Sequence, residues 1–91
     1  MTLEEVKNFI HVDFNDDDAK IELMKDAAIE YIEDALGIYN DKRAKQKLLV
    51  GTLVQDMYDK NSFTVDEKSE SVKYIVKSII LQEQLEGDDF A

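Results

Sequence analysis

Several residue types are absent from this chain of 91 residues or are scarce in it. It has no cysteine, which excludes disulfides, thiol catalysis and zinc–thiolate sites. It has no proline, as expected for a helical protein with few rigid turns. The three glycines are isolated, so there is no glycine-rich phosphate loop. The one histidine, His11, follows an apolar segment and is interpreted as a packing or capping residue. We therefore expect no enzyme, no cofactor and no metal site.

Basic residues and long apolar runs are also scarce. Acids outnumber bases 21 to 11, giving a formal charge of -10. Phosphate binding needs clustered Lys and Arg, so we expect no specific nucleic-acid binding, and anionic membranes are disfavoured for the same reason. The start, Met1 to Glu5, lacks the basic and apolar regions of a signal peptide, and runs such as Leu48–Val50 are too short to span a bilayer. These features predict a soluble protein made in the cytoplasm.

The composition that remains is globular, with 44% apolar and 35% charged residues. Apolar residues recur at helical spacing in stretches at about 3–10, 16–36, 41–60 and 69–85. The sequence predicts an all-α fold, a small bundle of about four helices packed around the third. Residues 1–85 form the single domain, and residues 86–91 are expected to be a flexible acidic tail.

The ends of the first two helices carry capping signals. Thr2 and Glu5 have the spacing of a capping box. Asn15 or Asp16 is expected to cap the second helix. Gly37 supplies the left-handed residue that commonly ends a helix.

The third helix is apolar around most of its circumference, which is typical of a helix in the middle of a core. We expect Leu48, Val54 and Tyr58 to be largely buried. Gly51 lies inside this helix, where glycine costs about 1 kcal/mol relative to alanine. It indicates a close helix crossing, with a hinge as the alternative.

The fourth helix has two candidate starts and two apolar sides. Thr64 and Glu67 repeat the capping-box spacing, and Ser69 is the other possible start. Its β-branched content leaves a strand at 74–81 as an alternative. One side forms a core stripe of Val72, Ile75, Val76, Ile79 and Ile80. The other side, with an anchor from the tail, is the candidate interface, made of Tyr74, Leu81, Leu85 and Phe90. The alternative is that neighbouring helices cover both sides.

Charged residues gather in two places. On the second helix the side opposite the core stripe forms a candidate acidic face of Glu22, Asp26, Glu30, Glu33 and Asp34. Four bases cluster near the start of the third helix: Lys42, Arg43, Lys45 and Lys47. Both clusters are also compatible with an ordinary solvated surface.

The acidic segment between the first two helices partly matches an EF-hand calcium loop. Asp13, Asn15 and Asp17 occupy the first three ligand positions. The pattern then fails, because Asp18 stands where glycine is needed for the turn and Met24 stands where a bidentate Glu is needed. The segment is interpreted as a loop rich in helix-capping acids.

The order of three motifs resembles a known family. The motifs are Leu3-Glu4-Glu5-Val6-Lys7-Asn8-Phe9-Ile10-His11-Val12-Asp13, then Asp16-Asp17-Asp18, then Ala27-Ala28-Ile29-Glu30-Tyr31-Ile32-Glu33-Asp34. Together with the stretch from Leu48 to Asn61, they resemble the tailed-phage head–tail connectors, also called adaptor or DNA-packaging proteins. The family's basic ending of this helix is altered here to Lys60-Asn61.

The resemblance implies a structural protein without catalytic residues. Subunits of that family form a homo-oligomeric ring, commonly of about twelve copies, beneath the portal protein of the capsid. The ring extends the DNA channel and docks the next head-completion or tail protein. The implied location is the head–tail junction of the virion, after synthesis in the cytoplasm of a bacterial host.

The acidic face leaves a hypothesis of a different class open. A small acidic binding module, such as a DNA mimic, would occupy a basic site on a host protein and inhibit it. A ring-forming protein should show large, concentration-dependent oligomers or bind a portal protein. A mimic should stay small and bind a basic partner. Light scattering distinguishes the two.

Overall fold

The structure is a computed structural model that describes the backbone of residues 1–88 and the side chains of residues 1–79, 81 and 82. Four helices follow one another: α1 (Leu3–Phe9), α2 (Asp18–Leu36), α3 (Ala44–Lys60) and α4 (Glu70–Asp88). No strand occurs in the described part of the chain. This confirms the all-α fold, and the segment at 74–81 is helix, so the strand alternative is wrong.

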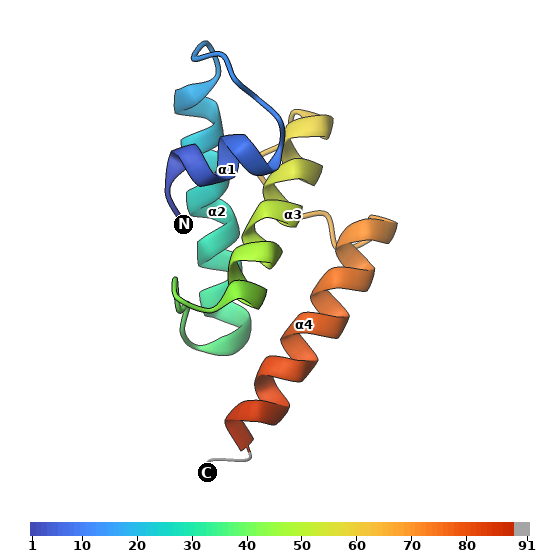
Figure 1. The fold of residues 1–91 in the computed structure, drawn as a ribbon. Helices are drawn as coiled ribbons and strands as arrows, with labels where there is room; N and C mark the ends of the chain where they lie inside the picture. Colours follow the sequence, from blue (N-terminus) through green and yellow to red (C-terminus); the bar gives the residue numbers. More distant parts are fainter. Residues whose placement is uncertain (89–91) are drawn as a thin grey trace.

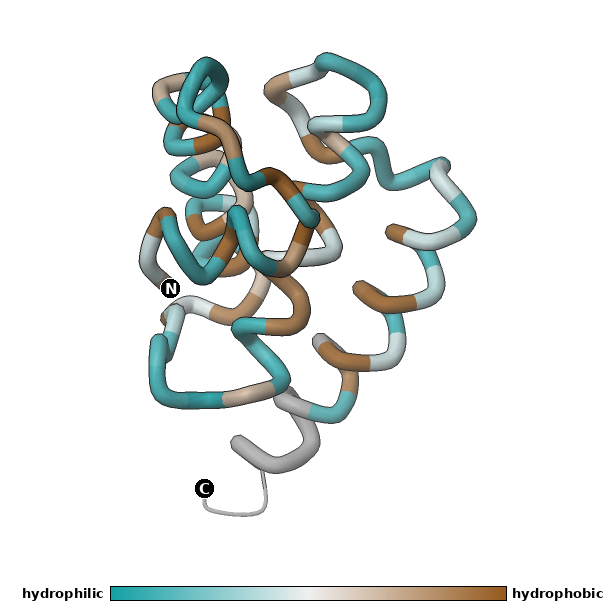
Figure 2. The backbone as a smooth tube through the Cα atoms, turned by 45° about the horizontal axis from the view of Figure 1, so that its top comes forward, coloured by the Kyte–Doolittle hydropathy of each residue, from teal (hydrophilic) through white to brown (hydrophobic). Residues whose placement is uncertain are grey.

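The helices pack around α3, as the sequence predicts. α2 and α3 lie side by side, α1 crosses this pair, and α4 packs on the other side of α3 (Figure 1). The molecule measures 45 × 27 × 18 Å, and the last turns of α4 extend beyond the other helices (Figure 1). Hydrophobic and hydrophilic segments alternate along the helices, as expected for helices with one buried side (Figure 2).

The core is one continuous cluster to which all four helices contribute. Met24, Leu49 and Met57 are among its fully buried side chains. The fourth helix adds Val72 and Ile79, which are 1% and 6% exposed. The core side predicted for α4 is therefore confirmed at these two positions, while the side chain of Ile80 lies outside the described residues.

Of the three α3 residues that were predicted to be largely buried, one is exposed. Val54 is fully buried and Tyr58 is half-buried, but Leu48 is 42% exposed. The prediction for Leu48 was wrong because α1, α2 and α4 cover other sides of α3 and leave the side that carries Leu48 open. A helix surrounded by three neighbours can still have one uncovered stripe.

Gly51 marks a close crossing, as expected. A Cβ atom added at this position would lie 2.7–2.8 Å from ring carbons of Phe9. The ring of Phe9 on α1 therefore packs directly on the backbone of α3, and any larger residue at 51 would require this ring to move. The hinge alternative has no support, since α3 is continuous from Ala44 to Lys60.

The helix starts were predicted with mixed success. The capping box of Thr2 and Glu5 is present, with both reciprocal hydrogen bonds formed. The expected cap of α2 by Asn15 or Asp16 is wrong: the N-cap residue is Asp17, and its side chain makes no capping bond. Instead, its carboxylate accepts a hydrogen bond from the Tyr58 hydroxyl at 2.5 Å.

The start of α4 also differs from one of its two predictions. The Thr64–Glu67 capping box does not form, because Glu67 accepts a hydrogen bond from Tyr31 and the Thr64 amide donates to Ser62. The helix begins at Glu70, directly after the other predicted start, Ser69.

Three helix ends use a left-handed residue. Gly37, with φ of 83°, ends α2 as predicted. His11, with φ of 61°, follows α1, and the Val12 amide donates to the Lys7 carbonyl in the pattern of a Schellman motif. Asn61 plays the same role after α3. His11 is thus a capping residue and is exposed, so the capping half of its interpretation is correct.

Candidate interaction surface

The outer side of α4 presents large apolar groups to solvent. Tyr74 is 76% exposed and Leu81 is 54% exposed, while Val72 and Ile79 on the opposite side are buried. The helix places these two sides about 180° apart, since each residue advances by about 100°. The structure therefore leaves Tyr74 and Leu81 uncovered by the rest of the chain.

The other two residues of the candidate interface fall outside what can be described. Leu85 belongs to α4, but its side chain is not among the described ones, and Phe90 lies beyond residue 88. The helix itself runs to Asp88, three residues past its expected end at 85. Residues 86–88 of the predicted tail therefore belong to α4, and residues 89–91 lie outside the described residues.

The candidate acidic face is assembled on the outer side of α2. Asp26, Glu30, Glu33 and Asp34 are exposed, and Glu22 is partly exposed. Two of the carboxylates are near Lys25, whose Nζ lies 2.7 Å from Glu22 and 4.0 Å from Asp26. Leu23, which is 60% exposed, lies among these acids. The face keeps most of its negative charge.

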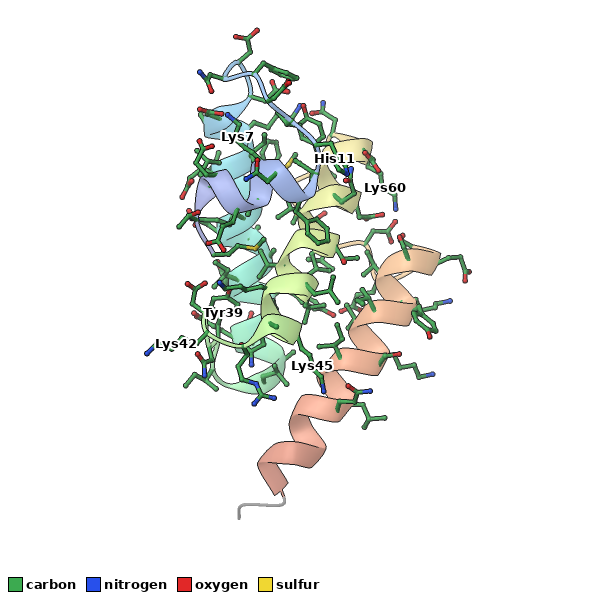
Figure 3. The ribbon with its side chains drawn as sticks, in the orientation of Figure 1. Lys7, His11, Tyr39, Lys42, Lys45 and Lys60 are labelled. Carbon is green, nitrogen blue, oxygen red and sulfur yellow. The ribbon has the colours of Figure 1, made fainter. Side chains whose placement is uncertain are left out.

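A lysine side chain holds together the acidic segment before α2. The side chain of Lys7 is almost fully buried, and its Nζ lies 2.8 Å from Asn15 Oδ1 and 2.8 Å from Asp18 Oδ1 (Figure 3). The hydrogen bond to Asp18 raises the pKa of Lys7. No group of three His, Cys, Asp or Glu side chains suited to a metal occurs among the residues that the structure describes.

The basic cluster is largely engaged within the chain. Lys47 forms an ion pair with Glu5 at 3.2 Å. Arg43 and Lys45 also have interaction partners. Lys42 is exposed and points away from the loop that carries it (Figure 3). The four basic side chains therefore do not form a single site at which all of them could bind one ligand.

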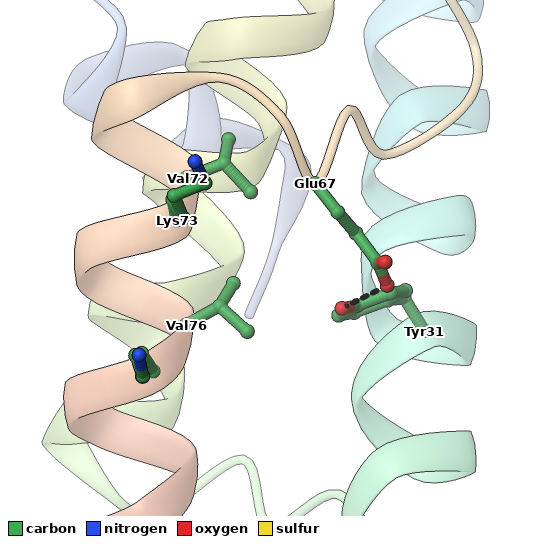
Figure 4. A pocket seen from close by; sticks show the side chains of 6 residues that line it. Tyr31, Glu67, Val72, Lys73 and Val76 are labelled. Atoms are coloured by element: carbon green, nitrogen blue, oxygen red, sulfur yellow. Dashed lines mark hydrogen bonds between the residues drawn. The ribbon is translucent and has the colours of Figure 1, made fainter.

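A groove that the sequence analysis missed lies between α2 and α4. It has a volume of about 280 Å³ and is lined by Tyr31, Glu67, Val72, Lys73, Val76 and Lys77. The Tyr31 hydroxyl donates to Glu67 Oε1 at 2.7 Å on the side of the groove that faces α4 (Figure 4). Burial, together with this hydrogen bond, raises the pKa of Tyr31 to about 12. Periodicity within a single helix carries no signal for a groove between two helices.

No helix within residues 1–88 is long and apolar enough to cross a membrane.

Comparison with known proteins identifies the family. The chain matches the family model described as phage gp6-like head–tail connector protein over residues 1–86. No curated protein matches the chain, and no solved structure matches it. The match includes all of α1, α2 and α3 and most of α4. This chain of four helices therefore belongs to the gp6-like head–tail connector proteins, which join the head and the tail of a bacteriophage.

Proposed function

We propose that the chain assembles as a ring beneath the portal protein, where it extends the DNA channel and docks the next head-completion or tail protein. Connectors are structural and non-enzymatic proteins. The observation that carries the proposal is the uncovered apolar side of α4, with Tyr74 and Leu81 exposed in the isolated subunit. Apolar side chains gathered on one face indicate a surface that is buried on association.

Burial of these side chains at an interface would contribute favourable free energy to association. Leaving a large apolar side chain in water forgoes roughly 1.5–3 kcal/mol relative to full burial. Tyr74 and Leu81 are seven residues apart on the same side of α4, so a single neighbouring element can cover both. A second subunit or the portal protein is the partner that we expect to do so.

The acidic face of α2 suits a position toward the channel. Asp26, Glu30, Glu33 and Asp34 are exposed and carry one sign of charge. DNA passing through a channel must slide without being held, and a negative wall repels its phosphates. We therefore place this face toward the DNA and the outer side of α4 at the contact between subunits.

The assembly surface is tested by placing a charge on α4. We expect Leu81→Asp and Tyr74→Asp to abolish oligomers, with or without portal protein, because a buried carboxylate without a partner opposes association. The subunit should remain helical, since the buried side of α4 is untouched. Sedimentation velocity measures assembly, and circular dichroism measures helicity.

Leu23→Asp is the matched control, because it makes the same leucine-to-aspartate change at a similarly exposed position on α2. It should assemble normally. If Leu81→Asp unfolds the subunit, the residue belongs to the core; if the folded variant still assembles, the α4 surface is not the interface. A wild-type chain that stays monomeric, does not bind portal protein and binds a basic host protein would instead support the hypothesis of an acidic module that inhibits a host protein.

A further inference from the structure

The groove between α2 and α4 has an apolar floor, two lysines on the α4 side, and the Glu67 carboxylate, which accepts a hydrogen bond from Tyr31, on the other side. Val72 and Val76 provide the floor, and Lys73 and Lys77 stand on the α4 side (Figure 4). Both lysines are exposed, and neither forms an ion pair with a carboxylate of the described residues. The chain has a net charge of -10, so two lysines of this kind beside an apolar groove differ from the predominantly acidic surface. The chemistry that complements them is an acidic segment with one large apolar side chain.

The size of the groove limits what can enter. One turn of an α-helix about 10 Å across and 5.4 Å long occupies roughly 420 Å³. The groove has a volume of about 280 Å³, which is less than one helical turn and enough for one aromatic side chain. The groove therefore accommodates one large apolar side chain at the end of a helix, and not a whole helical turn.

One segment of this chain has that chemistry. Residues 86–90 read Glu86-Gly87-Asp88-Asp89-Phe90, with three carboxylates and one aromatic ring. We propose that this acidic segment of one subunit binds the α2–α4 groove of the next subunit, with Phe90 on the floor and Asp88 and Asp89 beside Lys73 and Lys77. This inference rests on the ring proposed above and names a second contact that holds it together.

The segment cannot reach the groove of its own subunit. Because α4 is helical to Asp88, Val76 lies 12 residues, or about 18 Å, back along the helix axis. Phe90 is only two residues beyond Asp88, and two extended residues span at most about 7 Å. The end of α4 also projects past the other helices, away from the body of its own subunit (Figure 1). The contact must therefore form between copies.

Such a contact has the right symmetry for a ring. Each subunit offers a tail at one place and a groove at another, so the interface is heterologous and not self-complementary. Heterologous contacts repeated around an axis close into a ring when the rotation between subunits closes. The outer side of α4 and the groove then act together in one assembly.

The contact is tested with a fluorescein-labelled peptide of residues 84–91 added to the full-length chain carrying Phe90→Ala. This receptor retains the groove but lacks its own anchor. At low salt the peptide should bind, and the double variant Lys73→Glu/Lys77→Glu should weaken binding about tenfold, because two attractions become repulsions. Fluorescence anisotropy gives the affinities.

Two controls keep the result specific. Lys77→Glu is matched by Lys42→Glu, which makes the same charge change at an exposed site outside the groove and should leave binding unchanged. On the unaltered groove, a peptide with Phe90→Ala should not bind. A peptide with Asp88→Lys and Asp89→Lys should prefer the reversed groove. The experiment with the Asp88→Lys/Asp89→Lys peptide requires only that the Lys73→Glu/Lys77→Glu chain remains helical. The experiment with the Phe90→Ala peptide uses no lysine variant.

Failure of this inference and failure of the ring are separable. If the peptide does not bind, or binds the charge-reversed groove equally well, the tail–groove contact is wrong, whatever the oligomeric state. If the wild-type chain does not assemble with portal protein in sedimentation, the ring is wrong, whatever the peptide does. Peptide binding that depends on Phe90 and both lysines, together with weaker assembly of the Lys73→Glu/Lys77→Glu chain, is the supporting result.

Discussion

Single residues fix α1 and the loop before α2 to the rest of the fold. Lys7 has one charge in a nearly buried position, and it holds the loop before α2 through Asn15 and Asp18. Gly51 lets the ring of Phe9 approach the backbone of α3. α1 has only seven residues and would not be stable alone. Contacts of this kind therefore decide where it lies.

The contact between Gly51 and Phe9 predicts that the effect of Gly51→Ala on stability changes sign when Phe9 is replaced by alanine. We expect Gly51→Ala to destabilise the wild-type chain by about 1 kcal/mol, because the new methyl group overlaps the Phe9 ring and overpacking outweighs helix propensity. In a Phe9→Ala background the overlap is gone. There the same change should stabilise by about 1 kcal/mol, since only the preference of alanine for helix remains.

Urea denaturation of the four chains measures the cycle. Stabilisation by Gly51→Ala in both backgrounds would mean that the Phe9 ring, which is 37% exposed, simply moves into solvent. The close approach would then have no energetic consequence.

At the scale of elements, polar contacts hold the connector between α3 and α4. Ser69 donates to Asp56 Oδ1 at 2.9 Å, Lys60 pairs with Asp66 at 2.7 Å, and the Tyr31–Glu67 bond ties the connector to α2. These contacts set the direction in which α4 leaves α3. They therefore also set the width of the groove and the position of the outer side of α4.

The Tyr31–Glu67 contact predicts a pH dependence in alkaline solution. The pKa of Tyr31 is raised from 10.0 to about 12 in the folded state. A group with a raised folded pKa contributes stability that is complete below the unfolded pKa and is lost as the pH rises through the folded pKa. The wild-type chain should therefore lose stability between pH 10 and about 12 more steeply than Tyr31→Phe.

Denaturation midpoints of the two chains at pH 7 and at steps up to pH 12 test this. Lys7 and Lys60 also have raised pKa values, but they titrate equally in both chains, so the difference isolates Tyr31. Parallel curves for the two chains would show that the hydroxyl is not held by Glu67 in solution.

At the scale of the whole molecule, the charge of -10 governs the interaction with DNA. We expect the free subunit not to bind duplex DNA at physiological salt, with any dissociation constant weaker than about 10⁻⁴ M, the weak end for non-specific binders. The basic cluster does not offset the net charge, because Lys47 pairs with Glu5 and both Arg43 and Lys45 have partners.

Anisotropy of a labelled duplex measures this binding. A micromolar affinity that falls steeply with added salt would show that the basic cluster outweighs the net charge. The quadruple change of Lys42, Arg43, Lys45 and Lys47 to Gln would then remove the binding.

Local signals in the amino-acid sequence were enough to predict the all-α class and the order of the helices. Apolar spacing, the Thr2–Glu5 box and Gly37 are local signals, and local backbone physics obeys them. The side of α4 that carries Val72 and Ile79 was also predictable, because one helix period fixes which residues share a face. Exposure of Tyr74 and Leu81 on the opposite side has the same cause, although their role in assembly remains a prediction.

Which apolar side of a central helix stays open, and what lies between two helices, depends on how the helices pack against one another. Leu48 is exposed because three neighbours leave one stripe of α3 uncovered, which no pattern within α3 reveals. Asn15 binds Lys7 instead of capping α2, and Glu67 binds Tyr31 instead of capping α4, since partners distant in sequence compete for the same side chains. The α2–α4 groove exists for the same reason: it is a property of two helices and the connector that spaces them.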